Sequence, residues 1–218
     1  MDKIKNLRSI FPWSPRVDLD KIGNNSCMNA IIQCFCQIEE FASYFKYDDY
    51  INKIIDKYNH QNKKCLTSSF KILIDKIWPD EGMKIESKNR HFSPEEFRKK
   101  ISDMNPLLVK NNNINNIKDL LLFIILTLHE ELNENLDYNN INQIKKNDLD
   151  DRNKEQMFKV FYDEYLKQFR SKISELFCAI QKNAKKCLNC NATSYDFQEY
   201  FFLVFPLYEV KKYSIKKL

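Results

Sequence analysis

The stretch that decides the fold is Gly23-Asn24-Asn25-Ser26-Cys27-Met28-Asn29-Ala30-Ile31-Ile32-Gln33-Cys34-Phe35. Apolar residues recur in it at steps of three and four, which predicts a helix from Ser26 to about Tyr44. Ser26 suits the N-cap position, because its hydroxyl can accept from the free amides of the first turn. Cys27 would then face the positive end of the helix dipole, where a thiolate is stabilised. The segment alone leaves a second interpretation open, since a cysteine that begins an apolar helix is often a buried core residue.

Further helices follow from the same periodicity. We predict helices over 66–77, from Ser93-Pro94-Glu95-Glu96 to about Asn105, and over 117–132. In the second of these, Ser93 would be the cap and Pro94 the first helical residue. A fourth amphipathic stretch covers 156–180. Residues 134–154 are polar and charged, as in an insertion, and the aromatic run 197–208 predicts a strand.

Composition excludes several classes of protein. The 218 residues are 43% hydrophobic and 30% charged, as in a globular domain. The net charge of +5 comes from lysines interspersed with acids, so we expect no nucleic-acid partner. The longest apolar run, 120–126, is far shorter than the roughly 20 residues that span a membrane. Without a secretory signal, the seven cysteines suggest reduced thiols or metal ligands, and an intracellular protein, cytoplasmic or nuclear.

Three motifs in one order resemble the ubiquitin-specific proteases, the ubiquitin carboxyl-terminal hydrolases of the thiol type. The opening segment is similar to their cysteine box. Phe92-Ser93-Pro94-Glu95-Glu96-Phe97 and the ungapped run 116–133, which ends Leu128-His129-Glu130-Glu131-Leu132-Asn133, are similar to their second motif. The third is Cys187-Leu188-Asn189-Cys190 followed by the aromatic strand. The family does not use the position of His129 in catalysis, and we expect that side chain at the helix end, as a cap or on the surface.

The resemblance implies an α+β, papain-like fold with a helical thumb, a β-rich palm and zinc-bearing fingers that grip ubiquitin. We expect an N-terminal arm at 1–20 and a partial catalytic domain at 21–218, with the thumb at 21–180 and the start of the fingers and palm at 181–218. Ubiquitin or ubiquitinated proteins are the implied partners. We also expect the helix from Ser26 to pack against the helix at 117–132.

The nucleophile has two possible registers. An ungapped alignment through Met28-Asn29 places the family's cysteine on Ser26, whereas omitting one tyrosine places it on Cys27. We favour Cys27, because a thiol is a stronger nucleophile than a serine without a base. The family's oxyanion asparagine falls on Lys21 or Ile22, so Asn24 and Asn25 are the candidates to replace it.

Other parts of the family pattern are missing from the sequence. His60, His91 and His129 are its histidines, and none lies in a segment like the family's histidine box. Cys187 and Cys190 form half of a zinc site, and Cys178 is a candidate third ligand where a structural zinc wants four. We therefore expect a deubiquitinase homologue that is inactive or incomplete as this chain. The alternatives are a non-catalytic binding module and a truncated gene product.

Overall fold

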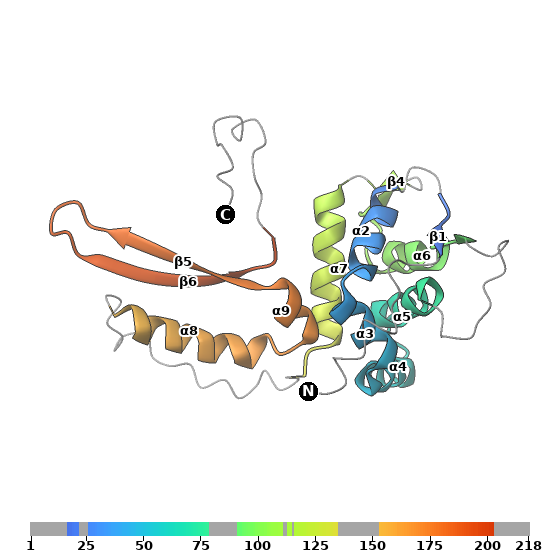
Figure 1. Ribbon diagram of the computed structural model, residues 1–218, viewed down its shortest axis with the longest axis horizontal. Coiled ribbons are helices and arrows are strands. Elements are labelled where there is room, and N and C mark those ends of the chain that lie inside the picture. The colour runs from blue at the N-terminus through green and yellow to red at the C-terminus, as the bar shows by residue number, and fades with distance from the viewer. Residues whose placement is uncertain are drawn as a thin grey trace. The chain divides into compact units, whose positions relative to one another are not determined.

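The computed structural model describes residues 17–21, 26–78, 91–110, 113–114, 116–134 and 153–202. The chain divides into two compact units (Figure 1). The first comprises Met1–Leu136 and Arg170–Leu176, and the second comprises Asp137–Phe169 and Phe177–Leu218. Helices and strands both occur, which confirms the mixed class. In the described ranges, no helix combines the length and the apolar character needed to cross a bilayer.

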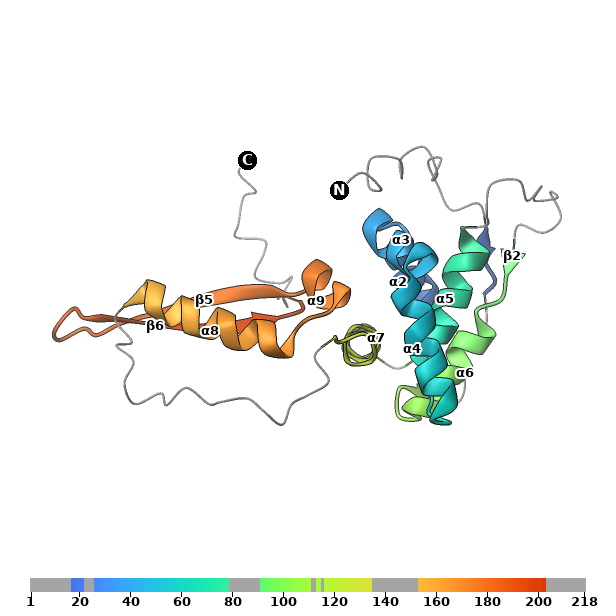
Figure 2. The ribbon, with the colours of Figure 1, turned by 90° about the horizontal axis from the view of Figure 1, so that it is seen from below.

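The first unit is mainly helical. Its helices are α2 (Ser26–Cys36), α3 (Glu39–Tyr47), α4 (Asp49–His60), α5 (Leu66–Ile77), α6 (Glu95–Met104) and α7 (Ile117–Glu131), with the short α9 (Lys172–Phe177) at its end. Two small sheets join them: β1 (Asp18–Leu19) is parallel to β2 (His91–Phe92), and β3 (Val109–Lys110) is antiparallel to β4 (Asn113–Ile114). Figure 2 looks along α7, beside the other helices of this unit.

An aromatic cluster forms the centre of this unit. Phe70 of α5 is fully buried, and its ring centroid lies 4.9 Å from that of Phe45 and 5.4 Å from that of Phe41, both on α3. The same ring contacts Phe35 of α2 at 6.2 Å and Phe97 of α6 at 5.7 Å. Each such pair contributes about 0.5–1.5 kcal/mol beyond the area that it buries. One phenylalanine of α5 thus holds three neighbouring helices together.

The packing of α2 against α7 is confirmed. Met28 and Ile32 of α2 are fully buried, as are Leu120, Ile124 and Leu128 of α7. The helix at 117–132 also matches its prediction, and its cap is Asn116, whose side chain accepts from the amides of Lys118 (3.0 Å) and Asp119 (3.4 Å). This pair of helices supports the segment that contains Cys27.

The single helix predicted from Ser26 to Tyr44 is wrong, because the chain breaks after Cys36. Ile38 adopts an extended backbone, with φ −80° and ψ 103°, before α3 begins. The indole of Trp78, at the end of α5, donates to the carbonyl of Cys36 at 2.9 Å. This hydrogen bond stands in place of the one that a further turn of α2 would supply. Ser26 is the first helical residue rather than the cap. The start of α6 is also one position later than predicted, since Pro94 holds the cap position and Glu95 begins the helix.

The second unit combines a helix with a hairpin. Helix α8 (Lys154–Gln168) packs on the antiparallel pair β5 (Ala179–Lys186) and β6 (Thr193–Tyr200), whose register runs from Ala179↔Tyr200 to Lys186↔Thr193. The stretch predicted as one amphipathic element at 156–180 is therefore α8, α9 and the start of β5. The strand predicted at 197–208 begins earlier, at Thr193. Its remainder beyond Phe202, and most of the polar stretch at 134–154, lie outside the described residues.

Candidate functional site

The first turn of α2 holds both candidate nucleophiles. Ser26 is exposed, Cys27 is half-buried and Met28 is fully buried. Successive helical residues are rotated by about 100°, so the two side chains point in different directions from the same turn. The oxyanion candidates Asn24 and Asn25 lie outside the described residues, and their role stays a prediction.

Asn29 fixes this turn to the strand before it. Its side-chain amide donates to the backbone carbonyl of Asp20 at 2.9 Å, nine residues earlier in the chain. Asp20 in turn donates its backbone N–H to the carbonyl of Phe92 at 2.9 Å, which extends the pairing of β1 with β2. The Oδ1 atom of Asn29 is buried and has no hydrogen-bond partner among the residues that the structure describes. The first turn of α2 is therefore hydrogen-bonded to Asp20, and Asp20 to Phe92.

His91 is connected to the same region through Asp20. Its Nδ1 lies 3.8 Å from the carboxylate of Asp20, and the two side chains are 64% and 48% exposed. A pair this exposed contributes at most about 1 kcal/mol. Within the described ranges, no hydrogen bond joins the sulfur of Cys27 to a histidine. His60 is the last residue of α4.

His129 is buried, so its predicted place as a cap or on the surface is wrong. Its Nδ1 lies 2.7 Å from the hydroxyl of Ser171, which begins the turn into α9. Burial lowers the pKa of this imidazole, because the interior disfavours the charged form. The contact places His129 in a structural junction.

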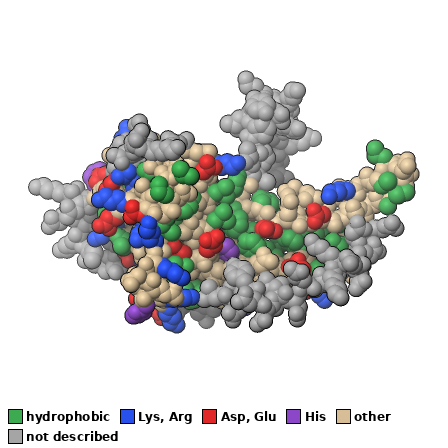
Figure 3. Space-filling model, turned by 180° about the vertical axis from the view of Figure 1, so that it is seen from behind, with side chains coloured by type: hydrophobic (Ala, Val, Ile, Leu, Met, Phe, Trp, Pro, Cys, Tyr) green, Lys and Arg blue, Asp and Glu red, His purple; other side chains and the backbone are tan. Residues whose placement is uncertain are grey.

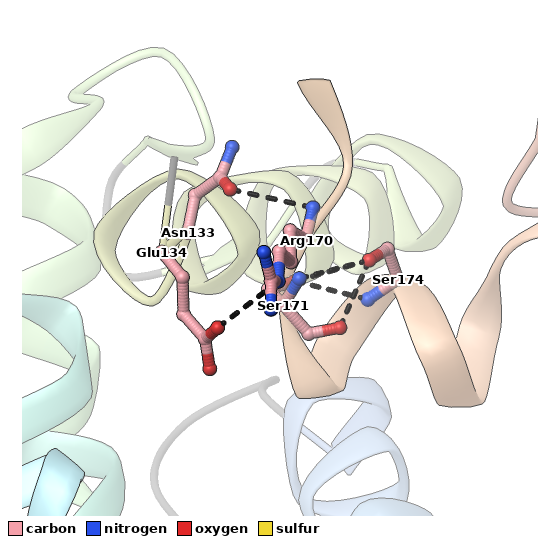
Figure 4. A network of polar contacts seen from close by, with 5 residues as sticks. All are labelled: Asn133, Glu134, Arg170, Ser171 and Ser174. Carbon is pink, nitrogen blue, oxygen red and sulfur yellow. Dashed lines mark hydrogen bonds and ion pairs between the residues drawn. The ribbon is translucent and has the colours of Figure 1, made fainter. Parts of the chain in front are cut away.

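That junction joins the end of α7 to the start of α9 (Figure 4). Ser171 and Ser174 exchange hydrogen bonds, with the Ser174 amide donating to the Ser171 hydroxyl at 3.1 Å. Arg170 donates its amide to the side chain of Asn133 at 3.3 Å and pairs its guanidinium with Glu134 at 3.3 Å. These polar contacts fix the segment 170–176 onto the helical unit.

Glu131, which no local motif in the sequence marks for this role, caps a distant helix. Its buried carboxylate accepts from the amides of Leu66 and Thr67, both at 2.7 Å, and from the Thr67 hydroxyl at 2.6 Å. The residue before α5, Cys65, makes no side-chain cap of its own. A helix start without a local cap was the one signal in the sequence for a partner elsewhere.

The other cysteines of this unit differ from Cys27 in exposure. Cys36 and Cys65 are buried, and burial raises the pKa of the Cys36 thiol to about 12 and that of the Cys65 thiol to about 11. Both are therefore thiols at neutral pH and poor nucleophiles. Cys34 is exposed but lies two turns into α2, away from the helix start.

Cys187 and Cys190 lie at the tip of the β5–β6 hairpin, as predicted. Cys178 precedes β5, and eight strand residues separate it from the tip. At about 3.3 Å per residue that is about 26 Å, so the proposal of Cys178 as a third ligand is wrong. In the part of the chain that the structure describes, no group of three or more potential ligands gathers. These residues do not fit a four-ligand zinc site.

The comparisons with known proteins all match one family. The family model for ubiquitin carboxyl-terminal hydrolase matches residues 17–218. Ubiquitin carboxyl-terminal hydrolase 12 of Saccharomyces cerevisiae is 26% identical over 90% of this chain, and hydrolase 5 of Arabidopsis thaliana is 29% identical over 85%. Hydrolase 2 of Bos taurus is 27% identical over 87%. The chain spans 16%, 19% and 29% of the lengths of these three relatives.

Proposed function

Because the chain belongs to the ubiquitin carboxyl-terminal hydrolase family, we propose that Cys27 is the nucleophile of a thiol hydrolase that acts on ubiquitin conjugates. The observation that carries this proposal is the half-buried thiol in the first turn of α2, with Asn29 holding that turn against Asp20. In the proposed reaction the Cys27 thiolate attacks the carbonyl carbon at the ubiquitin C-terminus. The amine leaves with a proton, and water then hydrolyses the thioester.

Cys27 is a better candidate than Ser26 for a chemical reason. A hydroxyl needs an adjacent base to become a nucleophile at neutral pH, whereas a thiol is already partly ionised and intrinsically more reactive. The positive end of the helix dipole favours an anion at this turn. Hydrolysis of this kind uses only protein groups and needs no cofactor.

We assign the helices of the first unit to the thumb and the β5–β6 hairpin to the start of the fingers. The expected boundary between the thumb at 21–180 and the fingers and palm at 181–218 falls two residues into β5, and α8 of the second unit lies on its thumb side. On this assignment ubiquitin is the partner that both parts contact. Zinc is proposed to need ligands beyond Cys187 and Cys190.

We further propose that the 218 residues alone react with ubiquitin without efficient turnover. Turnover needs a base that moves the proton between the thiol and the leaving amine. The Nδ1 atom of His129 contacts the hydroxyl of Ser171, and the Nδ1 atom of His91 faces the carboxylate of Asp20. The changed oxyanion position adds a further loss, since removing one such donor costs about 10²- to 10³-fold in rate.

A pair of solution measurements tests this function. Hydrolysis of a fluorogenic ubiquitin C-terminal amide should be close to the buffer rate, while ubiquitin itself should bind in calorimetry with similar affinity to the chain and to Cys27→Ala. Many turnovers per chain would refute the proposed lack of a base. Absence of both binding and reaction would refute a ubiquitin-directed function, and binding without any thiol reaction would favour the non-catalytic module.

A further inference from the structure

Helix α8 carries more apolar surface than the hairpin covers. Its inner face lies against β6, where the ring centroids of Phe161 and Phe197 are 6.0 Å apart. Its outer stripe is a row of three residues spaced by four positions, Phe158, Tyr162 and Leu166, which are 40%, 40% and 43% exposed. None of the 15 residues of α8, all of which the structure describes, is buried. The helix therefore leaves an apolar row in contact with solvent.

The rings of the outer stripe are held in place before any partner binds. The Phe158 ring lies 5.2 Å from that of Phe197, and it stacks on Tyr162 at 5.6 Å with 21° between the ring planes. A side chain that is already ordered loses less conformational entropy when a partner covers it. Figure 3 shows hydrophobic side chains (green) in a band along the second unit, with acidic side chains (red) beside them. Single exposed apolar residues are ordinary on protein surfaces, whereas a row of them on one helix face is typical of an interface.

A charged row with alternating sign lies next to the outer stripe. It consists of exposed residues spaced by four positions, Glu155, Lys159, Asp163 and Lys167. Residues four apart are neighbours on a helix surface, so the charged row runs parallel to the stripe. When a two-fold axis relates two antiparallel helices, the same flank of each comes together, and residue i of one meets residue j of the other while j meets i. In such a pair the charged row meets its own reverse.

This reversal pairs opposite charges along the whole row. Glu155 of one copy faces Lys167 of the other, and Lys159 of one copy faces Asp163 of the other. A parallel pair brings opposite flanks together instead, and the other flank of the stripe holds Phe161 and faces the hairpin. The charges therefore favour a second copy of this chain in the antiparallel orientation.

We propose that the chain forms a homodimer in which α8 packs antiparallel against α8 of a second copy. With the two-fold axis near Tyr162, that ring meets its counterpart, and Phe158 meets Leu166 of the second copy. A helix of 15 residues is about 22 Å long, so the contact is smaller than the interfaces of permanent dimers. The dimer is therefore weak, and the dimeric fraction rises with protein concentration.

Sedimentation equilibrium of the full 218-residue chain tests the proposal, with a reductant present to exclude disulfides between chains. The mean mass should rise from that of one copy toward that of two as the protein concentration increases. In Tyr162→Glu two carboxylates meet at the two-fold axis, so this variant should stay monomeric at every concentration. Ile72→Glu is the matched control, because Ile72 is a 43% exposed residue on α5, and it should associate as the unchanged chain does.

Two variants of the charged row test the orientation without changing the apolar residues. Lys159→Glu sets carboxylates against each other at two places in the dimer, and we expect the dissociation constant to rise about tenfold. Adding Asp163→Lys to Lys159→Glu exchanges the two charges and should restore the association. The proposal is overturned if the unchanged chain stays monomeric at all concentrations, if Tyr162→Glu associates like Ile72→Glu, or if the exchange of charges restores nothing. A monomeric chain that loses ubiquitin binding in Tyr162→Glu would also overturn it and assign the outer stripe to ubiquitin.

Discussion

At the scale of single residues, Asn29 is the side chain that positions the first turn of α2. Asn29→Ala removes the hydrogen bond that joins the first turn of α2 to the Asp20 carbonyl. We expect the rate of covalent labelling of Cys27 by a ubiquitin electrophile to fall about tenfold or more, because small displacements of reacting groups are costly. The free energy of unfolding measured in urea should fall by only about 1 kcal/mol.

Asn52→Ala is the matched control for this substitution, since Asn52 is an exposed asparagine on α4. Its labelling rate should equal that of the unchanged chain. Equal rates for Asn29→Ala and Asn52→Ala would show that Asn29 has no positioning role.

His129 makes the stability of the helical unit depend on pH. Burial lowers the pKa of its imidazole below the value of about 6.5 that it has when unfolded. The unfolded chain therefore binds the proton more readily, and the free energy of unfolding falls as the pH drops through and below about 6.5. Between pH 7.5 and pH 5.5, the free energy of unfolding measured in urea should fall less in His129→Gln than in the unchanged chain.

His60→Gln provides the comparison for that experiment, because His60 is exposed at the end of α4. Its loss of stability on acidification should match that of the unchanged chain. A pH dependence in His129→Gln as large as in His60→Gln would contradict the assignment to His129.

At the scale of helices, Glu131 of α7 is the cap of α5. Glu131→Gln keeps the shape but removes the charge that three donors of Leu66 and Thr67 share. Hydrogen bonds to a charged group contribute about 1.5–3 kcal/mol each, so we expect a loss of at least about 2 kcal/mol in the free energy of unfolding. Glu130→Gln, at the exposed neighbouring position, should change it by less than about 0.5 kcal/mol. Equal effects in urea unfolding would rule out the capping role.

The helices show what a sequence can and cannot specify. The helices at 66–77 and 117–131 were predictable because their apolar stripes are local patterns. The break after Cys36 was not predictable, because the Cys36 carbonyl accepts from the indole of Trp78, 42 residues later, and no local pattern shows this. The cap by Glu131 was hidden for the same reason, since its partners lie 64 to 66 residues away. Long-range polar contacts produce no periodic pattern in the sequence from which they could be predicted.

The candidate site was partly predictable. The turn of Cys27 and the hairpin position of Cys187 and Cys190 follow from short motifs. The tie between Asn29 and Asp20, and the burial of His129 against Ser171, depend on how separate segments pack. A histidine at a helix end gives no sequence signal of what covers it.

At the scale of the whole molecule, the hairpin tip presents two thiols to a metal that prefers four ligands. We predict that the purified 218-residue chain holds far less than one zinc per chain after dialysis against metal-free buffer, because two thiolates bind a tetrahedral ion weakly. Elemental analysis measures this ratio. One tightly held zinc per chain would contradict the prediction and require ligands beyond Cys187 and Cys190.

The central claim is that Cys27 is the nucleophile toward ubiquitin, and the most direct measurement is the site of an adduct. The chain is incubated with ubiquitin that carries a C-terminal electrophile, and peptide 22–46 is sequenced by mass spectrometry. We predict an adduct on Cys27, absent from Cys34 and Cys36, that Cys27→Ala abolishes and Ser26→Ala retains. An adduct on Ser26, or labelling that persists in Cys27→Ala, would contradict the account.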